Sequence, residues 1–326
     1  MAVLAPEVRS AAPRWLIRHE TLLAAILVVA LAILGLCNER FLTIDNLLNQ
    51  GRLMTEVGLL ALPMTFIIIT GGIDLSVGSI VGLCAIMLGY SWKNFGFPLP
   101  LAIMFAVGVG GVAGFVNGLL ITRVRVPPLI MTIATLALYR GLAEGISQAR
   151  SVRNYPEWFF FTGQGEWLGV PVQLWILLIG IIAAGVALDR TTFGRTLYAI
   201  GNNETAARFS GLPVDRVKLL VYTLSGLAAG VSAWVLVSRV TTTRSDMGTG
   251  YELDVIAAVV LGGTSIFGGS GTIWGTVVGL VMIQLLKNGL ALTGVKGDAT
   301  IIVIGAVLIA STLIASSLHS RREVAN

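Results

Sequence analysis

Residues on which most catalytic sites depend are scarce in this chain. Its 326 residues include only two histidines and two cysteines. His19 and His319 lie outside the apolar stretches, so no cluster of histidine and cysteine within those stretches can hold zinc or haem. No Gly-Lys dipeptide occurs, which excludes a P-loop for nucleotide phosphates. The sequence therefore predicts no metal site, no cofactor and no ATP hydrolysis by this chain itself.

Charged residues are also few. They make up 12% of the chain, against roughly 25% in an average soluble domain, whereas 55% of the residues are hydrophobic and the mean hydropathy is +0.86. This balance excludes a soluble globule. No basic stripe with interleaved aromatic residues is present, so nucleic acid is excluded as a partner. Cys37 and Cys84 both lie in apolar runs and are expected to be unpaired packing residues.

Long apolar runs are abundant. A membrane span needs about 20 apolar residues, and the runs predict an all-α polytopic membrane protein with about ten transmembrane helices in the lipid bilayer. The run Thr21–Cys37, preceded by Arg14 and Arg18, is also compatible with a signal peptide, but no small-residue cleavage site precedes Asn38, which favours a first span. The runs cover residues 21–37, 56–72, 76–92, 99–121, 127–147, 171–188, 217–239, 252–266, 272–291 and 299–317.

The basic residues predict the orientation. Ten spans place both termini on one side, and with that side inside, twelve Lys and Arg residues fall in cytoplasmic segments against eight outside. Both termini are therefore expected in the cytoplasm. The predicted organisation is a cytoplasmic segment 1–20, a transmembrane domain 21–317 with a cytoplasmic loop 189–218, and a cytoplasmic tail 318–326. A duplication that relates spans two to five to spans seven to ten with opposite topology is a further hypothesis.

Three features are expected near the predicted outer surface. Residues Leu42–Arg52 resemble a short interfacial helix with Thr43 or Asp45 as its N-cap. The loop 148–170 is rich in aromatic residues, which favours either an interfacial aromatic belt or a surface that docks an outer partner. Arg140 and Glu144 are four residues apart in a span, so they either form an intrahelical ion pair or mark a functional site.

The predicted cytoplasmic loop is too long for a simple turn between two membrane helices. Connections of about 2–8 residues are usual between packed helices, whereas this loop runs from Asp189 to Lys218. Within it, Glu204–Gly211 is typical of a short amphipathic helix that ends at a glycine, with Leu212 and Pro213 as a stop. A small helix on the cytoplasmic face indicates that a soluble partner pushes on it.

A second motif lies between the second and third spans. The stretch TGGIDLSVGS includes Gly71, Gly72, Asp74 and Ser76. One interpretation is a transport pathway or gate, because non-helical backbone survives at membrane depth only beside protein or water. The other is that Asp74 or Ser76 merely caps the third helix at the cytoplasmic surface.

A third motif is rich in glycine. It follows Glu252 and Asp254 and reads LGGTSIFGGSG from Leu261 to Gly271. Close packing of membrane helices through small residues explains such a stretch, and so does a flexible gate. The candidate gate residues are Gly262, Gly263, Gly268 and Gly269.

Together the three motifs carry a family resemblance. The stretches GGIDLSVGS (71–79), FGRTLYAIGNNETAARFSGLPVDRVK (193–218) and AAVVLGGTSIFGGSGT (257–272) resemble the membrane permeases of ribose-type carbohydrate ABC importers, which include ribose, xylose, rhamnose and autoinducer-2 systems. Residues 61–89 and 238–250 look most like the second permease of the autoinducer-2 or rhamnose systems. The resemblance extends over about residues 20–317.

This resemblance implies a non-catalytic, multi-pass permease of the bacterial inner membrane that works by alternating access. It implies a cytoplasmic ABC ATPase, a periplasmic sugar-binding protein, and a second permease copy or paralogue, with a heterodimer expected over a homodimer. Such permeases carry a Glu-Ala-Ala…Gly motif on the helix that contacts the ATPase, which here has Thr205 inserted after the glutamate. The matching residues are Glu204, Ala206, Ala207, Gly211, Leu212 and Pro213.

Two other functions remain open at this point. A secondary active sugar or ion transporter normally has several charged residues within its spans, and only Asp74, Arg140 and Glu144 are candidates here. A membrane enzyme would need a nucleophile and base or a metal, and the spans contain neither arrangement. The expected function is therefore import of a monosaccharide or sugar-like solute, driven by a separate ATPase subunit.

Overall fold

The computed structural model describes residues 35–36, 38–295, 299, 302 and 305–306. The predicted cytoplasmic segment 1–20, nearly all of the predicted first span 21–37 including Cys37, most of the predicted last span 299–317 and the tail 318–326 lie outside the described residues. Cys84, the other cysteine, is buried and unpaired, as expected.

The described chain is almost entirely helical, and six of its helices are long and apolar enough to cross a membrane: α2, α4, α5, α7, α10 and α12. The shorter elements are α3, η2, α6, α8, α9, α11 and one two-stranded antiparallel hairpin, β1–β2. In chain order the elements are α2 (Ile44–Ile69), α3 (Val77–Lys93), α4 (Leu99–Arg123), α5 (Pro128–Ser147), η2 (Glu157–Phe160), α6 (Phe161–Gln164), β1 (Glu166–Trp167), β2 (Val170–Pro171), α7 (Val172–Arg190), α8 (Thr192–Asn202), α9 (Glu204–Phe209), α10 (Val214–Val240), α11 (Tyr251–Leu261) and α12 (Ile273–Leu292).

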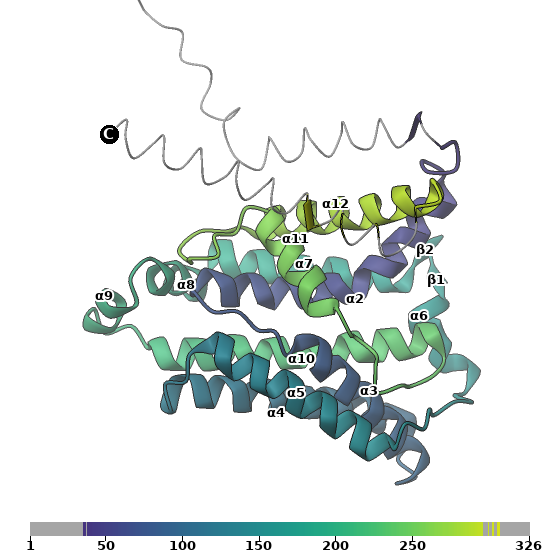
Figure 1. Ribbon diagram of the computed structural model, residues 1–326, viewed down its shortest axis with the longest axis horizontal. Coiled ribbons are helices and arrows are strands. Elements are labelled where there is room, and N and C mark those ends of the chain that lie inside the picture. The colour runs from purple at the N-terminus through teal and green to yellow at the C-terminus, as the bar shows by residue number, and fades with distance from the viewer. Residues whose placement is uncertain (1–34, 37, 296–298, 300–301, 303–304, 307–326) are drawn as a thin grey trace, which may run out of the picture.

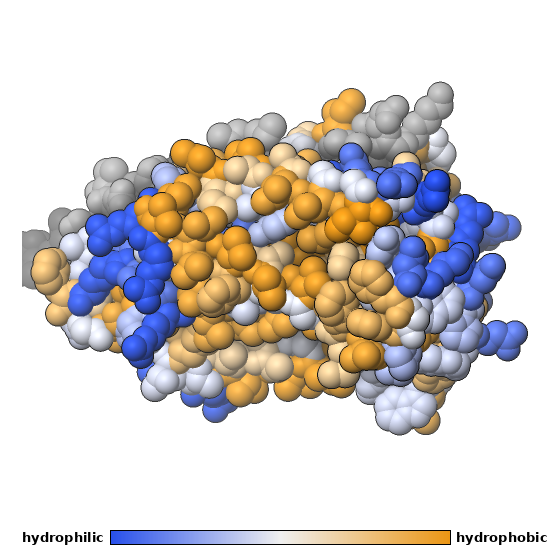
Figure 2. All heavy atoms as spheres, turned by 90° about the horizontal axis from the view of Figure 1, so that it is seen from below, coloured by the Kyte–Doolittle hydropathy of each residue, from blue (hydrophilic) through white to orange (hydrophobic). Residues whose placement is uncertain are grey.

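The long helices lie side by side, so the molecule has two ends (Figure 1). One end, here called the α9 end, carries α8 and α9, and the opposite end, the α6 end, carries α6 and the β1–β2 hairpin. Figure 2 shows a broad apolar band on one face, with polar residues gathered toward both ends. Exposed apolar side chains on α4 and α5, such as Met104 and Ile130, belong to the lipid-facing surface that a membrane span requires.

Prolines mark the start of three spans. Pro98, Pro127 and Pro171 are the N-caps of α4, α5 and α7. Proline is tolerated there because the first backbone amides of a helix have no partner within the helix. The predicted spans 76–92, 99–121, 127–147, 171–188, 217–239 and 272–291 are confirmed as helices to within a few residues.

The start of the second span was predicted wrongly. The expected interfacial helix Leu42–Arg52 and the expected span 56–72 are parts of one continuous helix, α2. Its N-cap is Thr43, the first of the two expected candidates, and the Thr43 hydroxyl accepts the Asn46 amide at 3.4 Å. The helix also continues through Pro63, because neighbouring helices in a membrane protein can compensate for the single hydrogen bond that a proline removes.

The core depends on a close antiparallel contact between α4 and α10 (Figure 1). A Cβ atom on Gly110 would overlap the carbonyl oxygen of Gly226, and one on Gly114 would overlap the carbonyl oxygen of Tyr222. Small residues at these positions let the two backbones approach, which is how membrane helices associate without a hydrophobic driving force.

The second half of the chain also packs through glycines, but between α11 and α12. A Cβ atom on Gly275 of α12 would overlap the carbonyl oxygen of Gly262, and one on Gly279 would overlap that of Ala258 on α11. The helix α3 packs on α4 as α11 packs on α12, and α4 packs on α10 as α12 packs on α2. This order of contacts is what the hypothesis of an inverted duplication requires.

Two glycines in α4 provide a matched test of the α4–α10 contact. Gly110→Ala should lower the free energy of unfolding by about 1–3 kcal/mol, the usual cost of overpacking, because its Cβ atom meets backbone that cannot move aside. Gly108→Ala, two residues away with nothing within 4 Å of its Cβ position, should be neutral or stabilising. Thermal unfolding of both variants in the same detergent measures the difference. Equal unfolding temperatures would show that the contact is not close.

Candidate functional site

Two helices, rather than one, form the polar segment between α7 and α10. The first, α8, begins at Thr191, whose hydroxyl accepts the Gly194 amide at 3.4 Å. Sequence reasoning missed this helix, although Gly194, Leu197 and Ile200 are buried at helical spacing after a threonine N-cap. That pattern was the available signal, and the many charged and polar residues of the loop obscured it.

The second helix, α9, matches the predicted one and ends as predicted. Its N-cap is Asn203, whose side-chain oxygen accepts the Ala206 amide at 2.9 Å. At the other end the Gly211 amide donates to the Arg208 carbonyl at 3.0 Å and the Leu212 amide donates to the Ala207 carbonyl at 3.1 Å. Gly211 has a φ of 80°, so these bonds form a glycine-dependent helix stop.

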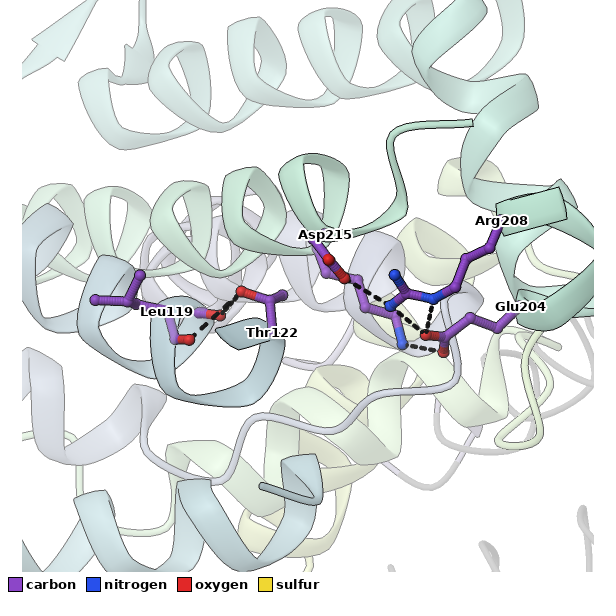
Figure 3. Close-up of polar contacts among 7 residues, drawn as sticks. Leu119, Thr122, Glu204, Arg208 and Asp215 are labelled. Atoms are coloured by element: carbon purple, nitrogen blue, oxygen red, sulfur yellow. Dashed lines mark hydrogen bonds and ion pairs between the residues drawn. The ribbon is translucent and has the colours of Figure 1, made fainter. Parts of the chain in front are cut away.

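Four charged side chains join α9 to the first turns of α10 (Figure 3). Arg208 donates to Glu204 at 2.8 Å and to Asp215 at 2.6 Å, and Lys218 donates to Glu204 at 2.6 Å. Partial burial raises the pKa of Glu204, but the bonds from Lys218 and Arg208 outweigh it and hold that pKa below its usual value. The bonds from Arg208 to Asp215 and Glu204 raise the pKa of Arg208. The cluster therefore stays charged and holds α9 against α10 at neutral pH.

The predicted contact residues on α9 and just after it do not all face outward. Ala206, Gly211 and Pro213 are exposed, Leu212 is half-buried, and Ala207 is only 4% exposed because it packs against the protein itself. Sequence reasoning did not select Phe209, which is 90% exposed at the tip of the segment. The surface that α9 offers to a partner is thus small and mixed, with the exposed polar residues Thr205, Arg208 and Ser210 around one projecting aromatic ring.

The second and third motifs meet beside α8. The Gly269 amide donates to the Ile69 carbonyl, at the end of α2, at 2.9 Å. A Cβ atom on Gly201 of α8 would overlap that same carbonyl oxygen, and one on Gly268 would lie 3.1 Å from the Gly71 amide nitrogen. We call Gly71, Gly201, Gly268 and Gly269 the glycine junction. It joins α8 to the end of α2 and to the connection between α11 and α12. Gly201 was not predicted, because nothing in a single sequence marks a glycine as a contact point.

Gly262 and Gly263 have a different place. Gly262 lies against Gly275, where α11 crosses α12, in the kind of close contact that small residues allow. Gly263 has a φ of 90° and begins the turn that leads to the glycine junction. The predicted span 252–266 is therefore wrong at its end, since α11 stops at Leu261.

Asp74 is fully buried in a polar network. Its Oδ1 accepts the Ser76 amide at 2.9 Å and the Ser76 hydroxyl at 2.6 Å, and its Oδ2 accepts the Ser225 hydroxyl of α10 at 3.1 Å. The Asn117 side chain of α4 donates to the Ser76 hydroxyl at 2.8 Å, and the Tyr139 hydroxyl of α5 donates to the Asn117 oxygen at 3.2 Å. One aspartate therefore connects α3, α4, α5 and α10.

This network lies inside the membrane rather than at its surface. Asn117 is about 9 Å along the axis from the end of α4, at 1.5 Å per residue, and Ser225 is about 16 Å from the start of α10. The interpretation that Asp74 merely caps a helix at the surface is therefore incomplete, although it does bond to the amide at the start of α3. Gly72 is also near this network, because a Cβ atom there would lie 2.6 Å from the buried Tyr222 hydroxyl. No cluster of three metal-binding side chains occurs in the described part of the chain.

Substitution of Asp74 measures what the network contributes. Asp74→Ala leaves the Ser76 and Ser225 hydroxyls without their acceptor, so the free energy of unfolding should fall by about 1–3 kcal/mol. Asp74→Asn keeps an oxygen for Ser76 and should retain most of the stability. The measurement is thermal unfolding in detergent, with the two variants side by side. Equal losses in both variants would mean that the negative charge, not the hydrogen-bond acceptor, holds the helices together.

Comparison with known proteins identifies the family. The family model described as "Branched-chain amino acid transport system / permease component" matches residues 44–312. The autoinducer 2 import system permease protein LsrD of Escherichia coli K12 is 37% identical over 310 residues, which cover 93% of this chain and 94% of that protein. The LsrD protein of Yersinia enterocolitica is 38% identical over 296 residues, 89% of each chain. No solved structure gives a significant match.

The match spans α2 to α12 and all three motifs. It agrees with the apolar helices of the structure, which place the chain in the bacterial inner membrane as a multi-pass protein. It also agrees with the helix α9, which stands apart from the spans at one end of the molecule (Figure 1). The chain belongs to this family of ABC importer permeases, whose members are the membrane-spanning, non-catalytic subunits of their transport systems.

Proposed function

We propose that this permease imports autoinducer 2 or a related monosaccharide-like solute, powered by a separate cytoplasmic ATPase. The family description speaks of branched-chain amino acids, but the relatives that match nearly the whole chain are named for autoinducer 2. A small polar solute also suits a bundle whose buried polar groups are mostly hydroxyls and amides rather than charges.

The observation that carries the proposal is the construction of α9. It is a six-residue helix at one end of the molecule, capped at both ends and tied to α10 by Glu204, Arg208, Asp215 and Lys218. A helix this short is not stable alone in water, so these contacts must hold it in place. The rigid mount and the exposed Phe209 fit a part that receives force from the ATPase.

The force has two routes into the membrane. Through the ion cluster it reaches α10, and through α8 and the glycine junction it reaches the end of α2 and the segment 263–271. Asp74 and Ser76 lie where α10 meets α3, so a displacement of α10 changes the hydrogen bond between Ser225 and Asp74. We assign Gly71, Gly72, Asp74, Ser76, Gly262, Gly263, Gly268 and Gly269 to the moving parts of the pathway, in which inward-open and outward-open states alternate.

The topology belongs to the same proposal. The α9 end faces the cytoplasm, and ten spans place both termini there, with the membrane domain 21–317 and the coupling loop 189–218. At the α6 end, Trp158, Phe161 and Trp167 are exposed whereas Tyr155 and Phe159 are buried. The exposed rings are suited to the periplasmic surface of the inner membrane, where a periplasmic sugar-binding protein docks.

The complete transporter contains a second permease. We propose a paralogue rather than a second copy, on the strength of the similarity to the autoinducer 2 permeases. The chain alone, reconstituted in liposomes, should show neither ATP hydrolysis nor uptake driven by a pH or sodium gradient. With the ATPase, the second permease and the binding protein, it should import the solute that the binding protein binds. Gradient-driven uptake by the single chain would instead make it a secondary transporter.

A surface substitution tests the role of α9. Ala206→Arg puts a long charged side chain on its exposed face and should abolish both co-purification of the ATPase and ATP-dependent uptake, without loss of membrane insertion. Asn94→Arg makes the same change at an exposed position of the α6 end and should leave co-purification unchanged. Pull-down of the ATPase from detergent extracts measures both. Normal pull-down and uptake with Ala206→Arg would rule out α9 as the contact.

A further inference from the structure

The connection between α10 and α11, residues 241–250, runs through the protein without forming a helix. It begins at the α6 end and runs along α3 toward the α9 end. Thr243 lies beside Gly89, the carbonyl oxygens of Ser245 and Met247 lie beside Gly82, and the carbonyl oxygen of Gly248 lies beside Gly78. From Gly89 to Gly78 the helix α3 advances about 16 Å. We call residues 241–250 the descending segment.

Glycines make room for it. A Cβ atom on Gly82 would lie 2.6 Å from Nη1 of Arg140 and 2.9 Å from the Met247 carbonyl oxygen. Gly248 and Gly250 have φ values of 73° and 85°, which side chains disfavour. The glycines of α3 thus form a groove. The glycines of the descending segment let its backbone turn at the end of that groove beside Gly78.

Arg140 of α5 supplies the hydrogen bonds that the descending segment cannot make to itself. Its Nη1 donates to the carbonyl oxygens of Ser245 and, at 3.0 Å, Met247, and its Nη2 donates to that of Gly78 at 3.4 Å. Arg140 lies about 18 Å along α5 from Pro128 and about 10 Å from Ser147, well within the span. One guanidinium therefore clamps the descending segment to α3 at membrane depth.

No ion pair between Arg140 and Glu144 forms in the structure, so that expectation is wrong; the arginine bonds to backbone carbonyls instead. Three carboxylates, those of Glu252, Glu144 and Asp246, nevertheless act on Arg140 electrostatically from a longer range. They belong to α11, α5 and the descending segment itself. Asp246 already pairs with Arg244. If the carbonyl contacts break, Glu144 and Glu252 are the alternative partners for the charge of Arg140, so that charge is not left without a partner in the membrane.

One helix, α10, links this clamp to the ion cluster at the α9 end. The 27-residue helix α10 runs without an internal proline from the α9 ion cluster to Val240, directly before the descending segment (Figure 1). A displacement of its first turn by α9 is therefore carried along its length to residue 241. Among the contacts that hold the segment there are the clamp to Arg140 and, nearer the α6 end, the pairing of Thr243 with Val152.

We propose that Arg140 is a positioning residue of the transport reaction, which holds the descending segment against α3 in one state and releases it when α10 moves. The inference rests on the proposed function, because it takes α9 as the point where the ATPase acts. It assigns to residues 241–250 the role of the gate at the α6 end. The gate opens by leaving the glycine groove, not by bending a helix.

The test uses thiol labelling of the complete transporter in proteoliposomes. Cys37 and Cys84 are replaced by alanine. Met247→Cys then places a thiol on a residue whose backbone carbonyl Arg140 holds, and whose native side chain is only 8% exposed. A membrane-impermeant maleimide should label this cysteine slowly without nucleotide and faster after ATP and vanadate are added, which trap the ATPase with ADP and vanadate bound. With Arg140→Ala added, labelling without nucleotide should rise by on the order of tenfold or more, as expected from losing hydrogen bonds of a charged group, and should no longer respond to nucleotide.

Controls separate the possible outcomes. Arg153→Ala removes an exposed arginine at the same end and should change nothing. Arg140→Lys, which keeps the charge but not the fork of donors, should lie between wild type and alanine and serves if the alanine variant fails to fold. Wild-type labelling and nucleotide response in the folded arginine variants would overturn the inference and leave Arg140 a purely structural residue. Failure of ATP-dependent import by the wild-type complex would instead overturn the proposed function.

Discussion

Backbone polar groups inside a bilayer must find partners within the protein, and this constraint explains where the informative residues lie. In the part of the chain that the structure describes, the connections 70–76 and 241–250 leave helical geometry at membrane depth. The first is held by Asp74 and its hydroxyl and amide partners, and the second by the guanidinium of Arg140. Glycines of α3 let the second stretch approach closely enough for its bonds. A polar side chain buried here is thus a substitute for missing helix hydrogen bonds.

The same constraint explains what the sequence could and could not predict. Helices such as α4, α5 and α7 were predictable because each is an apolar run of membrane length that begins at a proline. The unbroken α2 was not, because a polar first half resembles a surface helix until its packing is known. The sequence also placed α9 correctly, since its caps are local. The depth of Asp74, the junction at Gly201 and the partners of Arg140 come from tertiary contacts, which no local pattern encodes.

In this account, α10 links the two ends of the molecule. Its first turns carry the ion cluster that holds α9, its middle supplies Ser225 to Asp74, and its last residue leads into the descending segment. Its long glycine contact with α4 permits sliding or tilting more readily than separation, since the two backbones touch over most of their length. A transporter with few charges in its spans can work in this way, because the energy comes from outside and the membrane part only has to transmit a displacement.

The central claim is that nucleotide at the α9 end moves the descending segment at the other end. Spin labels on Asn94→Cys, at the end of α3, and Arg244→Cys, in the descending segment, report that movement directly by pulsed electron paramagnetic resonance in the complete transporter. Both positions are exposed, so the labels should not disturb packing. The account predicts that the distance between the labels changes when ATP and vanadate trap the ATPase with ADP and vanadate bound, and returns when nucleotide is removed. Identical distance distributions with and without trapped nucleotide would contradict it.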